Sequence, residues 1–320
     1  MTLPAYPNQI TLPDIQAEFG GAPNVWTARS GLTGSNWSGI TYGNGLFVAV
    51  SQNSSSGVLG ATSPDGITWT NRTMPPSNYL SVAYGNGTFV AVPVYGAAAA
   101  TSPDGITWTS QTPPTTLATL KIVFGNGIFL VYDRNGAQTI YTSTAGITWT
   151  SRSLPRSVNS WSFTFGGGLF VALPRTGVNE VYTSPDGITW TTRTIPTVAT
   201  DWNLITYGGG KYICFGYQGV LISTDAVTWT YYATPSGYPL NQIWRDSAYG
   251  NSTFVVVPQN TRTSAVSSDG LTWTEKTLPT TGFWPGVAYG NQRFVAIQQG
   301  VGYPAATYTF SPLVSLGDYY

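Results

Sequence analysis

The chain has no histidine and only one cysteine among its 320 residues. Without histidine, imidazole metal ligation and imidazole general-base catalysis are both absent, which removes most hydrolase mechanisms. Cys214 stands alone in an apolar run, so no internal disulfide is available and a buried, unreactive thiol is expected. We therefore expect no metal site, no cofactor and no catalytic residue, and we predict that the chain is not an enzyme.

Charge is also scarce. Charged residues make up 8% of the chain, against about 25% in typical soluble proteins, and the 13 Lys and Arg balance the 13 Asp and Glu. No basic field exists to hold nucleic acid or an anionic membrane. No apolar stretch is long enough to span a bilayer, and the start of the chain lacks a secretory signal. We expect no nucleic-acid partner, no membrane insertion and synthesis in the cytoplasm without a signal peptide.

Glycine, proline and aromatic residues are abundant, and they recur in two phrases, YGNGxFVAV and SPDGITWT. The first phrase is anchored by an aromatic residue before glycine, at intervals of 40 to 42 residues, at Tyr42, Tyr84, Phe124, Phe165, Tyr207, Tyr249 and Tyr289. Seven copies at this period are typical of propeller blades. The predicted fold class is all-β, a seven-bladed β-propeller of four-stranded antiparallel blades.

Each unit is interpreted as four strands, A to D, predicted in the first unit over Ser38–Tyr42, Leu46–Val50, Gly57–Ser63 and Ile67–Thr73. The second phrase has six complete copies and one split copy, since Trp26 to Arg29 matches its end and Tyr308 to Pro312 matches its beginning. We predict that strand D of the last blade, Val25–Arg29, comes from the start of the chain and closes the ring. The predicted domains are residues 1–24 and 313–320, two attachment segments, and residues 25–312, the propeller.

SPDGITW resembles the Asp-box, or BNR repeat, of sialidase-like propellers, and the resemblance covers Trp26 to Pro312. A short carboxylate between strands C and D can accept backbone N–H bonds, glycine takes the unusual φ, and tryptophan packs beneath. The structural carboxylates of these boxes are Asp65, Asp104, Asp186, Asp225 and Asp269. One copy has Ala145 in place of the carboxylate and another has Ala226 in place of the glycine, which favours a structural role over a metal or catalytic one.

The resemblance implies what an enzyme of that family would need: an arginine triad, a Tyr/Glu nucleophile pair and an acidic proton donor. Four arginines stand three residues after a box tryptophan, which makes them part of the repeat and not a convergent triad: Arg29, Arg72, Arg152 and Arg193. A sialidase-like glycan hydrolase is therefore the weakest alternative. It predicts activity that is lost when Arg134 or Arg175 is changed.

In sialidase-like propellers the ligand face is built from the D–A and B–C loops, opposite the box turns. Aromatic residues recur just before strand A, and we list them as candidate ligand-binding residues: Trp37, Tyr79, Trp161, Trp202, Trp244 and Trp284. Their rings could stack on sugars, or they could wedge adjacent blades apart, and both interpretations stay open. Charged residues of the loops could form a rim for an anionic glycan, or be solvated surface: Asp133, Arg134, Arg156, Arg175, Glu180, Asp201 and Arg262.

The two ends carry a further resemblance. Ile10 to Gly21, containing Glu-Phe-Gly-Gly, resembles a signature near the start of many phage tail or virion proteins, and Ser315 to Tyr320 resembles the segment that soon follows it there. The candidate virion-attachment residues are Asp14, Phe19, Gly20, Gly21, Asp318, Tyr319 and Tyr320. Alternatively, Leu12 to Phe19 is a helical turn that caps the propeller.

These observations lead to a functional hypothesis. The chain is predicted to be a bacteriophage virion protein of a tail, fibre or baseplate, attached to other virion proteins through its ends. Its propeller would display a binding face for a host-surface glycan or protein, with several copies per particle. The alternative is a passive structural or decoration protein that contacts only other virion proteins.

Overall fold

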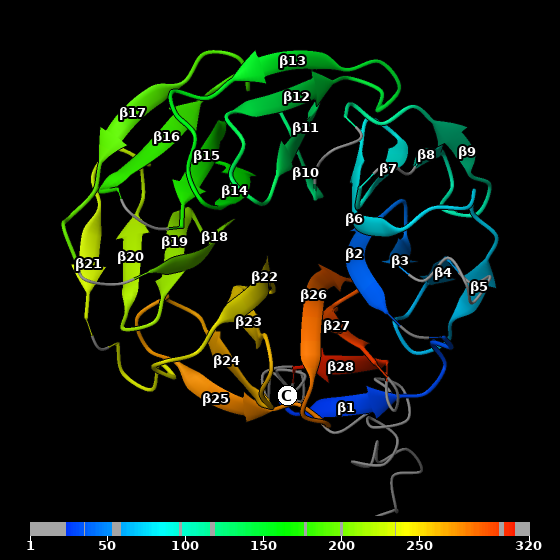
Figure 1. Cartoon of the computed structure of the whole chain (residues 1–320). Coiled ribbons are helices and arrows are strands. Elements are labelled where there is room, and N and C mark those ends of the chain that lie inside the picture. Colours follow the sequence, from blue (N-terminus) through cyan, green and yellow to red (C-terminus); the bar gives the residue numbers. More distant parts are fainter. Residues whose placement is uncertain are drawn as a thin grey trace, which may run out of the picture.

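The chain folds into seven four-stranded antiparallel sheets arranged around one axis (Figure 1). The computed structural model describes residues 24–34, 36–52, 59–95, 98–115, 119–175, 178–198, 201–233, 235–300 and 304–310. The predicted fold class, an all-β seven-bladed propeller, is confirmed. The described part contains no helix long and apolar enough to cross a membrane.

Each blade runs from an innermost strand A to an outermost strand D. Blade 1 comprises β2 (Trp37–Gly43), β3 (Leu46–Ser51), β4 (Gly60–Ser63) and β5 (Thr70–Arg72). Blade 2 comprises β6 (Tyr79–Gly85), β7 (Thr88–Pro93), β8 (Ala99–Ser102) and β9 (Thr109–Gln111). Blade 3 comprises β10 (Leu120–Gly125), β11 (Ile128–Asp133), β12 (Thr139–Ser143) and β13 (Thr150–Ser153). Blade 4 comprises β14 (Trp161–Gly166), β15 (Leu169–Pro174), β16 (Glu180–Ser184) and β17 (Thr191–Thr194).

The remaining blades follow the same order. Blade 5 comprises β18 (Trp202–Gly208), β19 (Lys211–Gly216), β20 (Val220–Ser223) and β21 (Thr230–Tyr232). Blade 6 comprises β22 (Trp244–Gly250), β23 (Thr253–Pro258), β24 (Thr263–Ser267) and β25 (Thr274–Thr277). Blade 7 comprises β26 (Phe283–Gly290), β27 (Arg293–Gln299), β28 (Ala305–Thr309) and β1 (Trp26–Arg29).

Blade 7 is assembled from both ends of the chain, as the split repeat predicts. Strand β1 pairs antiparallel with β28, with Trp26 opposite Tyr308 and Arg29 opposite Ala305. Figure 1 shows the blue β1 beside the red β28. The backbone N–H of Asn24 donates to the carbonyl of Thr309 at 2.7 Å, which extends the pairing by one bond. The ring thus closes by hydrogen bonding and leaves no blade with an unfinished sheet.

The recurrent aromatic-glycine pair holds neighbouring blades together. At Gly43, an added Cβ atom would lie 2.1 Å from the ring of Tyr84, the corresponding aromatic of the next blade. The same contact is repeated between all neighbouring blades. It ends at Gly290 of blade 7, where an added Cβ atom would lie 2.2 Å from the ring of Tyr42 in blade 1. Glycine is required at these positions because only a residue without Cβ lets the next ring lie on the backbone.

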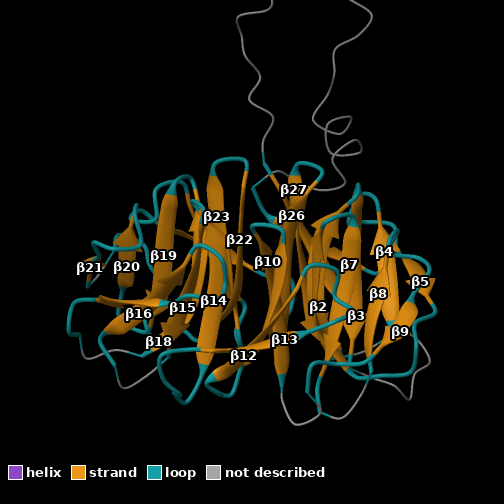
Figure 2. Cartoon of the chain, turned by 90° about the horizontal axis from the view of Figure 1, so that it is seen from above, coloured by secondary structure: helices purple, strands orange, loops and turns teal. Residues whose placement is uncertain are grey.

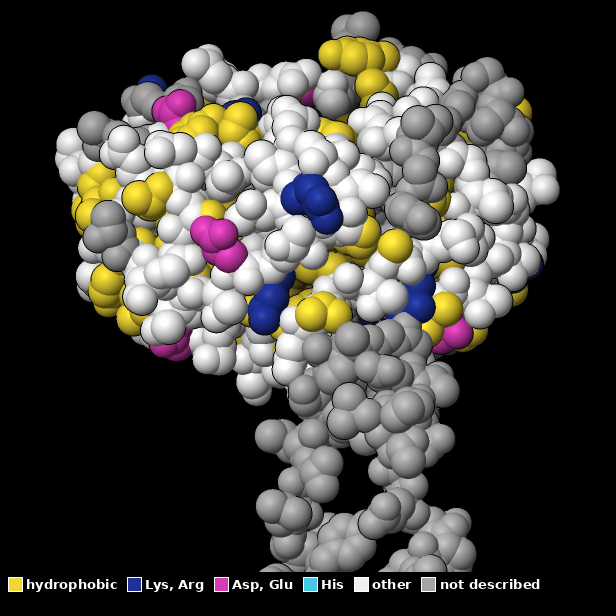
Figure 3. Space-filling view, turned by 90° about the horizontal axis from the view of Figure 1, so that it is seen from below, with side chains coloured by type: hydrophobic (Ala, Val, Ile, Leu, Met, Phe, Trp, Pro, Cys, Tyr) yellow, Lys and Arg dark blue, Asp and Glu magenta, His cyan; other side chains and the backbone are white. Residues whose placement is uncertain are grey.

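The core lies between blades. Strand B is almost fully buried in every blade, and its side chains pack alternately against the blades on either side. Cys214 is part of this packing, on strand β19, and burial raises the pKa of its thiol. The outer strands D are short and exposed, and charged side chains are few and scattered over the outer surface seen in Figure 3.

The turns between strands C and D are stabilised by their carboxylates. In blade 2, Asp104 Oδ1 accepts from the backbone N–H groups of Ile106 and Thr107, both at 2.8 Å, and from the Ser102 hydroxyl at 3.0 Å. The carboxylates Asp65, Asp186, Asp225 and Asp269 make the same bonds. The prediction that strand D begins at the isoleucine of this turn is wrong, because these N–H groups bond the carboxylate and leave the sheet ladder to start at Thr70 and its equivalents.

Strand direction sorts the connections onto two faces (Figure 2). Because all neighbouring strands are antiparallel, the A–B and C–D turns share one face, and the D–A and B–C connections share the other. Strand β1 begins, and strand β28 ends, on the face of the C–D turns, so the described ends at Asn24 and Phe310 lie there. The opposite face, called here the loop face, is free of the described chain ends.

Candidate functional site

A cavity of about 350 Å³ occupies the centre of the ring, and residues of strand A from all seven blades line it. A second cavity of about 220 Å³ adjoins it and is lined by residues at the start of strands A and after the end of strands B, on the loop face. Both cavities are lined by Lys121, Arg134, Arg245 and Pro285. We call the two together the channel, and the shared part its mouth.

A bulge in strand A shapes the mouth. In blades 1, 2, 5, 6 and 7 the pairing of strand A with strand B shifts register near its first residues. The residues within these shifts that line the channel are Ser38, Leu80, Asn203, Arg245 and Pro285. Strands A of blades 3 and 4 have no such shift, and these two blades contribute an arginine from just beyond strand B instead.

Those arginines, Arg134 and Arg175, occupy equivalent positions ten residues after the aromatic of the YG pair. The other five blades carry neutral residues there: Gln52, Val94, Tyr217, Gln259 and Gln299. Burial lowers the pKa of Arg134, the Tyr132 hydroxyl opposes that change, and the nearby Arg175 adds to it. Two adjacent guanidinium groups at one edge of a cavity make a site for a carboxylate or another oxyanion.

Arg245 adds a third arginine from the other side of the mouth. Its guanidinium carbon lies 4.8 Å from the centroid of the Phe283 ring, so a cation–π contact holds the side chain in place. The channel is therefore lined by three arginines, of which Arg134 and Arg245 line the mouth and Arg175 lines the larger cavity.

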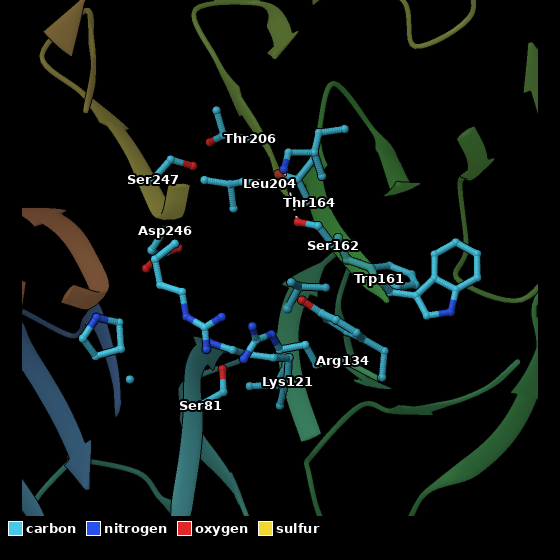
Figure 4. Close-up of a pocket in the computed structure, with 18 of the residues that line it drawn as sticks. Ser81, Lys121, Arg134, Trp161, Ser162, Thr164, Leu204, Thr206, Asp246 and Ser247 are labelled. Atoms are coloured by element: carbon cyan, nitrogen blue, oxygen red, sulfur yellow. Dashed lines mark hydrogen bonds between the residues drawn. The ribbon is translucent and has the colours of Figure 1, made fainter. Parts of the chain in front are cut away.

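Strand A of each blade carries an equivalent position three residues before its YG aromatic, and we call these seven positions the inner ring. Five of these positions carry uncharged residues: Gly39, Ser81, Ser162, Leu204 and Gly286. Blade 3 carries Lys121 and blade 6 carries Asp246. Figure 4 shows Lys121 and Arg134 of blade 3 and Asp246 of blade 6 at the cavity, with Thr164, Thr206 and Ser247 around the rest of the wall.

Lys121 and Asp246 perturb each other. Burial lowers the pKa of Lys121, the Asp246 carboxylate opposes this, and Arg134 adds to the lowering. Burial raises the pKa of Asp246, while Lys121 and the N–H groups of Val287 and Ser247 act in the other direction. Asp246 Oδ2 accepts from Val287 N at 2.9 Å, as Ser162 Oγ accepts from Ile205 N at 3.1 Å in blade 4. In blades 4 and 6 the side chain at this position thus binds strand A to strand A of the next blade.

Asn203 brings an unused amide to the wall. It is the bulge residue of blade 5, and both its Nδ2 and Oδ1 atoms are buried without a hydrogen-bond partner among the described residues. A buried amide with neither bond made is costly unless a ligand or a water molecule supplies the partners.

The six candidate aromatics are almost fully buried. Their side chains are at most 4% exposed. Trp37 packs on Val295 and Ile297 of the preceding blade, and Trp244 packs on Ile213 and Phe215 in the same way. The prediction that these rings offer their faces to a sugar needs correcting for Trp37, Tyr79, Trp161, Trp202, Trp244 and Trp284, because all six fill the space between blades. Trp161 and Trp244 contribute to the channel wall only as packed side chains.

Of the seven predicted rim residues, only Arg134 and Arg175 line the channel. Asp133 accepts from the backbone N–H groups of Thr119 and Asn135, so it shapes its own loop. Arg156 and Glu180 form an ion pair at 3.6 Å near the outer edge of blade 4, and Arg262 donates to the carbonyl of Leu278. Asp201 is exposed.

The remaining predicted residues fall in two groups. The arginines after the box tryptophans lie on outer strands, where each donates from Nε to a threonine hydroxyl of strand C, as Arg72 does to Thr62 at 2.8 Å. They do not converge on the channel. Asp14, Phe19, Gly20, Gly21, Asp318, Tyr319 and Tyr320 lie outside the described residues. Within the described ranges, no three Cys, Asp or Glu side chains gather as metal ligands would.

Lys121, Arg245 and Asp246 were not among the predicted site residues. Two of these residues could be found from the repeat. When the seven units are aligned on the YG aromatic, Lys121 and Asp246 are the charged residues at a position that is uncharged in the other five units. Arg245 is harder to find, because its exposure to the channel depends on a bulge.

Comparison with known proteins supports the fold. The family model of a DUF6242 β-propeller domain matches residues 33–161. No curated protein sequence matches the chain. A catalytically inactive virginiamycin B lyase from Staphylococcus aureus, with quinupristin, superposes with a TM-score of 0.73 at 12% identity, over 88% of this chain and 98% of the lyase. YCF48 bound to a D1 peptide superposes at 0.67 and 15% identity, over 90% and 98%. YCF48 from Cyanidioschyzon merolae gives 0.66 and 14%, over 89% and 98%.

The lyase likeness corrects the prediction that the chain is not an enzyme. Streptogramin B lyases are enzymes with this architecture, so a propeller of this kind does not exclude an enzyme. At 12% identity the likeness shows the fold alone and assigns no reaction. The inactive lyase carries a histidine-to-alanine change, whereas this chain contains no histidine, so any chemistry in its channel uses other residues.

Proposed function

We propose that the chain is a glycan-binding β-propeller of a bacteriophage particle, which binds an acidic host-surface glycan in its channel and is held to the particle through its two ends. The observation that carries the ligand class is the charge at the channel. Lys121, Arg134, Arg175 and Arg245 line it, and Asp246 is the one acid among its lining residues.

The rest of the wall suits a sugar. The side-chain hydroxyls of Ser81, Ser162, Thr164, Thr206 and Ser247, together with the Asn203 amide, offer donors and acceptors on several sides. Volumes of about 350 and 220 Å³ fall near the range of about 300–1,000 Å³ typical of small-molecule sites. Arginine pairs bind carboxylates with two parallel bonds, which makes a uronic or sialic acid unit the expected anchor.

The placement of the ends supports attachment to a particle. Asn24 and Phe310 lie on the face of the C–D turns, so anchoring through residues beyond them would leave the channel mouth pointing away from the anchor. The resemblance of Ile10 to Gly21 and Ser315 to Tyr320 to a phage tail-protein signature supports the kind of particle. Several copies per particle would raise a weak single-site affinity by multivalency.

The ligand class is tested by titrating the chain with oligogalacturonate and with the same oligomers methyl-esterified at their carboxyl groups. We expect the acid to bind and the ester to bind more weakly. Arg134→Gln and Arg175→Gln should each weaken acid binding by about ten- to a hundredfold, the range of a charged hydrogen bond. Arg152→Gln, on an outer strand, is the matched control and should change nothing. Equal binding of acid and ester would overturn the ligand class.

Attachment is tested with the phage that encodes the chain. Purified, labelled protein should bind cells of the susceptible host saturably and reduce adsorption of the phage. Protein that ignores host cells, but is incorporated into particles only when the end segments are intact, would contradict host recognition and favour a passive virion role.

A further inference from the structure

We propose that Lys121 is a nucleophilic amine that forms an imine with the carbonyl group of a 2-oxo acid bound in the channel. This inference rests on the proposed anion-binding role of the mouth and adds a covalent step to it. It concerns Lys121 and Asp246, the two charged residues of the inner ring.

Lys121 is not part of the repeated scaffold. The equivalent position holds glycine, serine or leucine in five blades, so the fold is built without a charge there. No ion pair within 4.0 Å involves Lys121 among the described residues, although Asp246 lines the same cavity. A partly buried ammonium group without a contact ion pair is an unusual arrangement for a purely structural lysine.

The surroundings of Lys121 favour its neutral amine. Burial lowers the pKa of Lys121, the Asp246 carboxylate opposes the change, and Arg134 adds to it. The groups that share its cavity are Tyr132 and Arg134 of blade 3, Arg175 of blade 4, and Arg245 and Asp246 of blade 6. The arginines stay protonated and can bind the anion, whereas Lys121 is the cation that can lose its proton. Desolvation beside other cations is how proteins make lysine nucleophilic.

The same wall supplies the acid that imine formation needs. The neutral Lys121 Nζ adds to the carbonyl carbon, and the nitrogen proton passes to the new alkoxide oxygen, giving a carbinolamine. The carboxylic acid of Asp246 then protonates the hydroxyl group, which leaves as water. The resulting iminium loses its nitrogen proton to the Asp246 carboxylate, so the acid is regenerated and one water is released for each imine. Burial raises the pKa of Asp246, which favours the protonated form that this step requires.

The arginine pair explains why the carbonyl should stand next to a carboxylate. Arg134 lines both cavities together with Lys121, and Arg175 lines the larger of the two. A carboxylate held by these two groups would place the carbon attached to it toward the interior of the channel. Lys121 lines the same part of the channel as Arg134, and Figure 4 shows the two labelled side chains next to each other on the cavity wall. A 2-oxo acid has its carbonyl at that carbon.

The test incubates the full chain with pyruvate and sodium cyanoborohydride, which reduces an imine to a stable secondary amine, and locates the adduct by peptide mass spectrometry. The chain has only three lysines. Lys211 donates to the Asp269 carbonyl, Lys276 lies on the outer strand β25, and both, with the N-terminal amine, are internal controls. We expect at least about tenfold more adduct on Lys121 than on either control, from the effective concentration of a bound reactant.

Variants separate the roles. Asp246→Asn should slow labelling of Lys121 by about a hundredfold, the lower end for general acid catalysis, while leaving the labelling of Lys211 unchanged. Lys121→Met should remove the selective adduct and still unfold in a single cooperative thermal transition, which shows that the variant is folded. Labelling spread equally over the three lysines would overturn the inference. If oligogalacturonate binds but no selective adduct forms, the imine is wrong and the proposed anion site stands. If neither occurs, both are wrong.

Discussion

The indole Nε1 of Trp26 donates a hydrogen bond to the hydroxyl of Ser264 at 2.8 Å, although 238 residues separate them in the chain. Trp26 belongs to β1, the strand that the start of the chain adds to blade 7, and Ser264 belongs to β24 of blade 6. Trp26 also lies 7% exposed in a cluster with Tyr308 and Leu278. Strand β1 therefore completes the sheet of blade 7 and also binds blade 7 to blade 6.

Ring closure should dominate the stability of the chain. Trp26→Ala should lower the free energy of unfolding by about 3–5 kcal/mol, as expected when a large buried aromatic is truncated. Ser264→Ala should cost about 1–3 kcal/mol, because it leaves the buried indole N–H without an acceptor. Denaturant unfolding of both variants measures this. A Trp26→Ala protein as stable as the parent would mean that β1 does not close the ring.

The glycines of the YG pairs should tolerate no side chain. Gly43→Ala should cost about 3 kcal/mol, near the upper end for overpacking, because the new methyl would lie 2.1 Å from the Tyr84 ring. Gly45 provides a control two residues away, since it has φ +76° and nothing within 4 Å of an added Cβ. Gly45→Ala should cost about 1 kcal/mol, for the left-handed backbone alone. Thermal melts of the two variants should differ, and equal melting temperatures would contradict the interblade contact.

The C–D turns should make stability depend on pH in the acid range. The N–H groups of Thr107 and Ile106 lower the pKa of Asp104, and similar bonds lower the pKa of Asp225 to about 2. A carboxylate whose folded pKa is below its unfolded value of about 3.9 contributes stability above that value and loses it as pH falls through the folded pKa. The melting temperature should therefore fall from about pH 4 towards pH 2, and Asp104→Ala should fall less steeply there while starting lower at neutral pH. The same slope in both proteins would show that Asp104 is not involved.

The tryptophans beneath these turns should differ in their contributions. Trp273 is 3% exposed and donates to the carbonyl of Gly270 at 2.9 Å. Trp149 is only partly buried, and its Nε1 has no partner among the described residues. Trp149→Ala should cost a few kcal/mol, and Trp273→Ala should cost about 1 kcal/mol more for the hydrogen bond. Denaturant titration of both variants decides the order, and a larger loss at Trp149 would contradict it.

The repeats are enough to predict the propeller, its seven blades and the closure by β1. The motifs repeat because every blade makes the same contact with the next one, in which a glycine such as Gly43 lies against an aromatic ring such as that of Tyr84. The sequence alone does not give the role of the aromatics before strand A. A repeated aromatic residue is expected both where rings stack on a sugar and where they fill the space between blades, and only the burial of the ring distinguishes the two. Trp37 and its equivalents are wedges because the preceding blade's strand B covers them.

The site lies where the repeat breaks. Arg134 and Arg175 could be found as charged exceptions in blades 3 and 4, and Lys121 and Asp246 could have been found in the same way. Arg245 could not, because the bulge of β22 changes which residue turns to the channel, and register shifts of one residue leave no mark in a sequence alignment of the units.

The most direct test of the channel as an acidic-glycan site is a crystal structure of the chain with trigalacturonate. The account predicts a sugar carboxylate within hydrogen-bond distance of both the Arg134 and Arg175 guanidinium groups, with the sugar entering from the loop face. Sugar bound on the outer strands or at the C–D turns, with the channel holding only water, would contradict it.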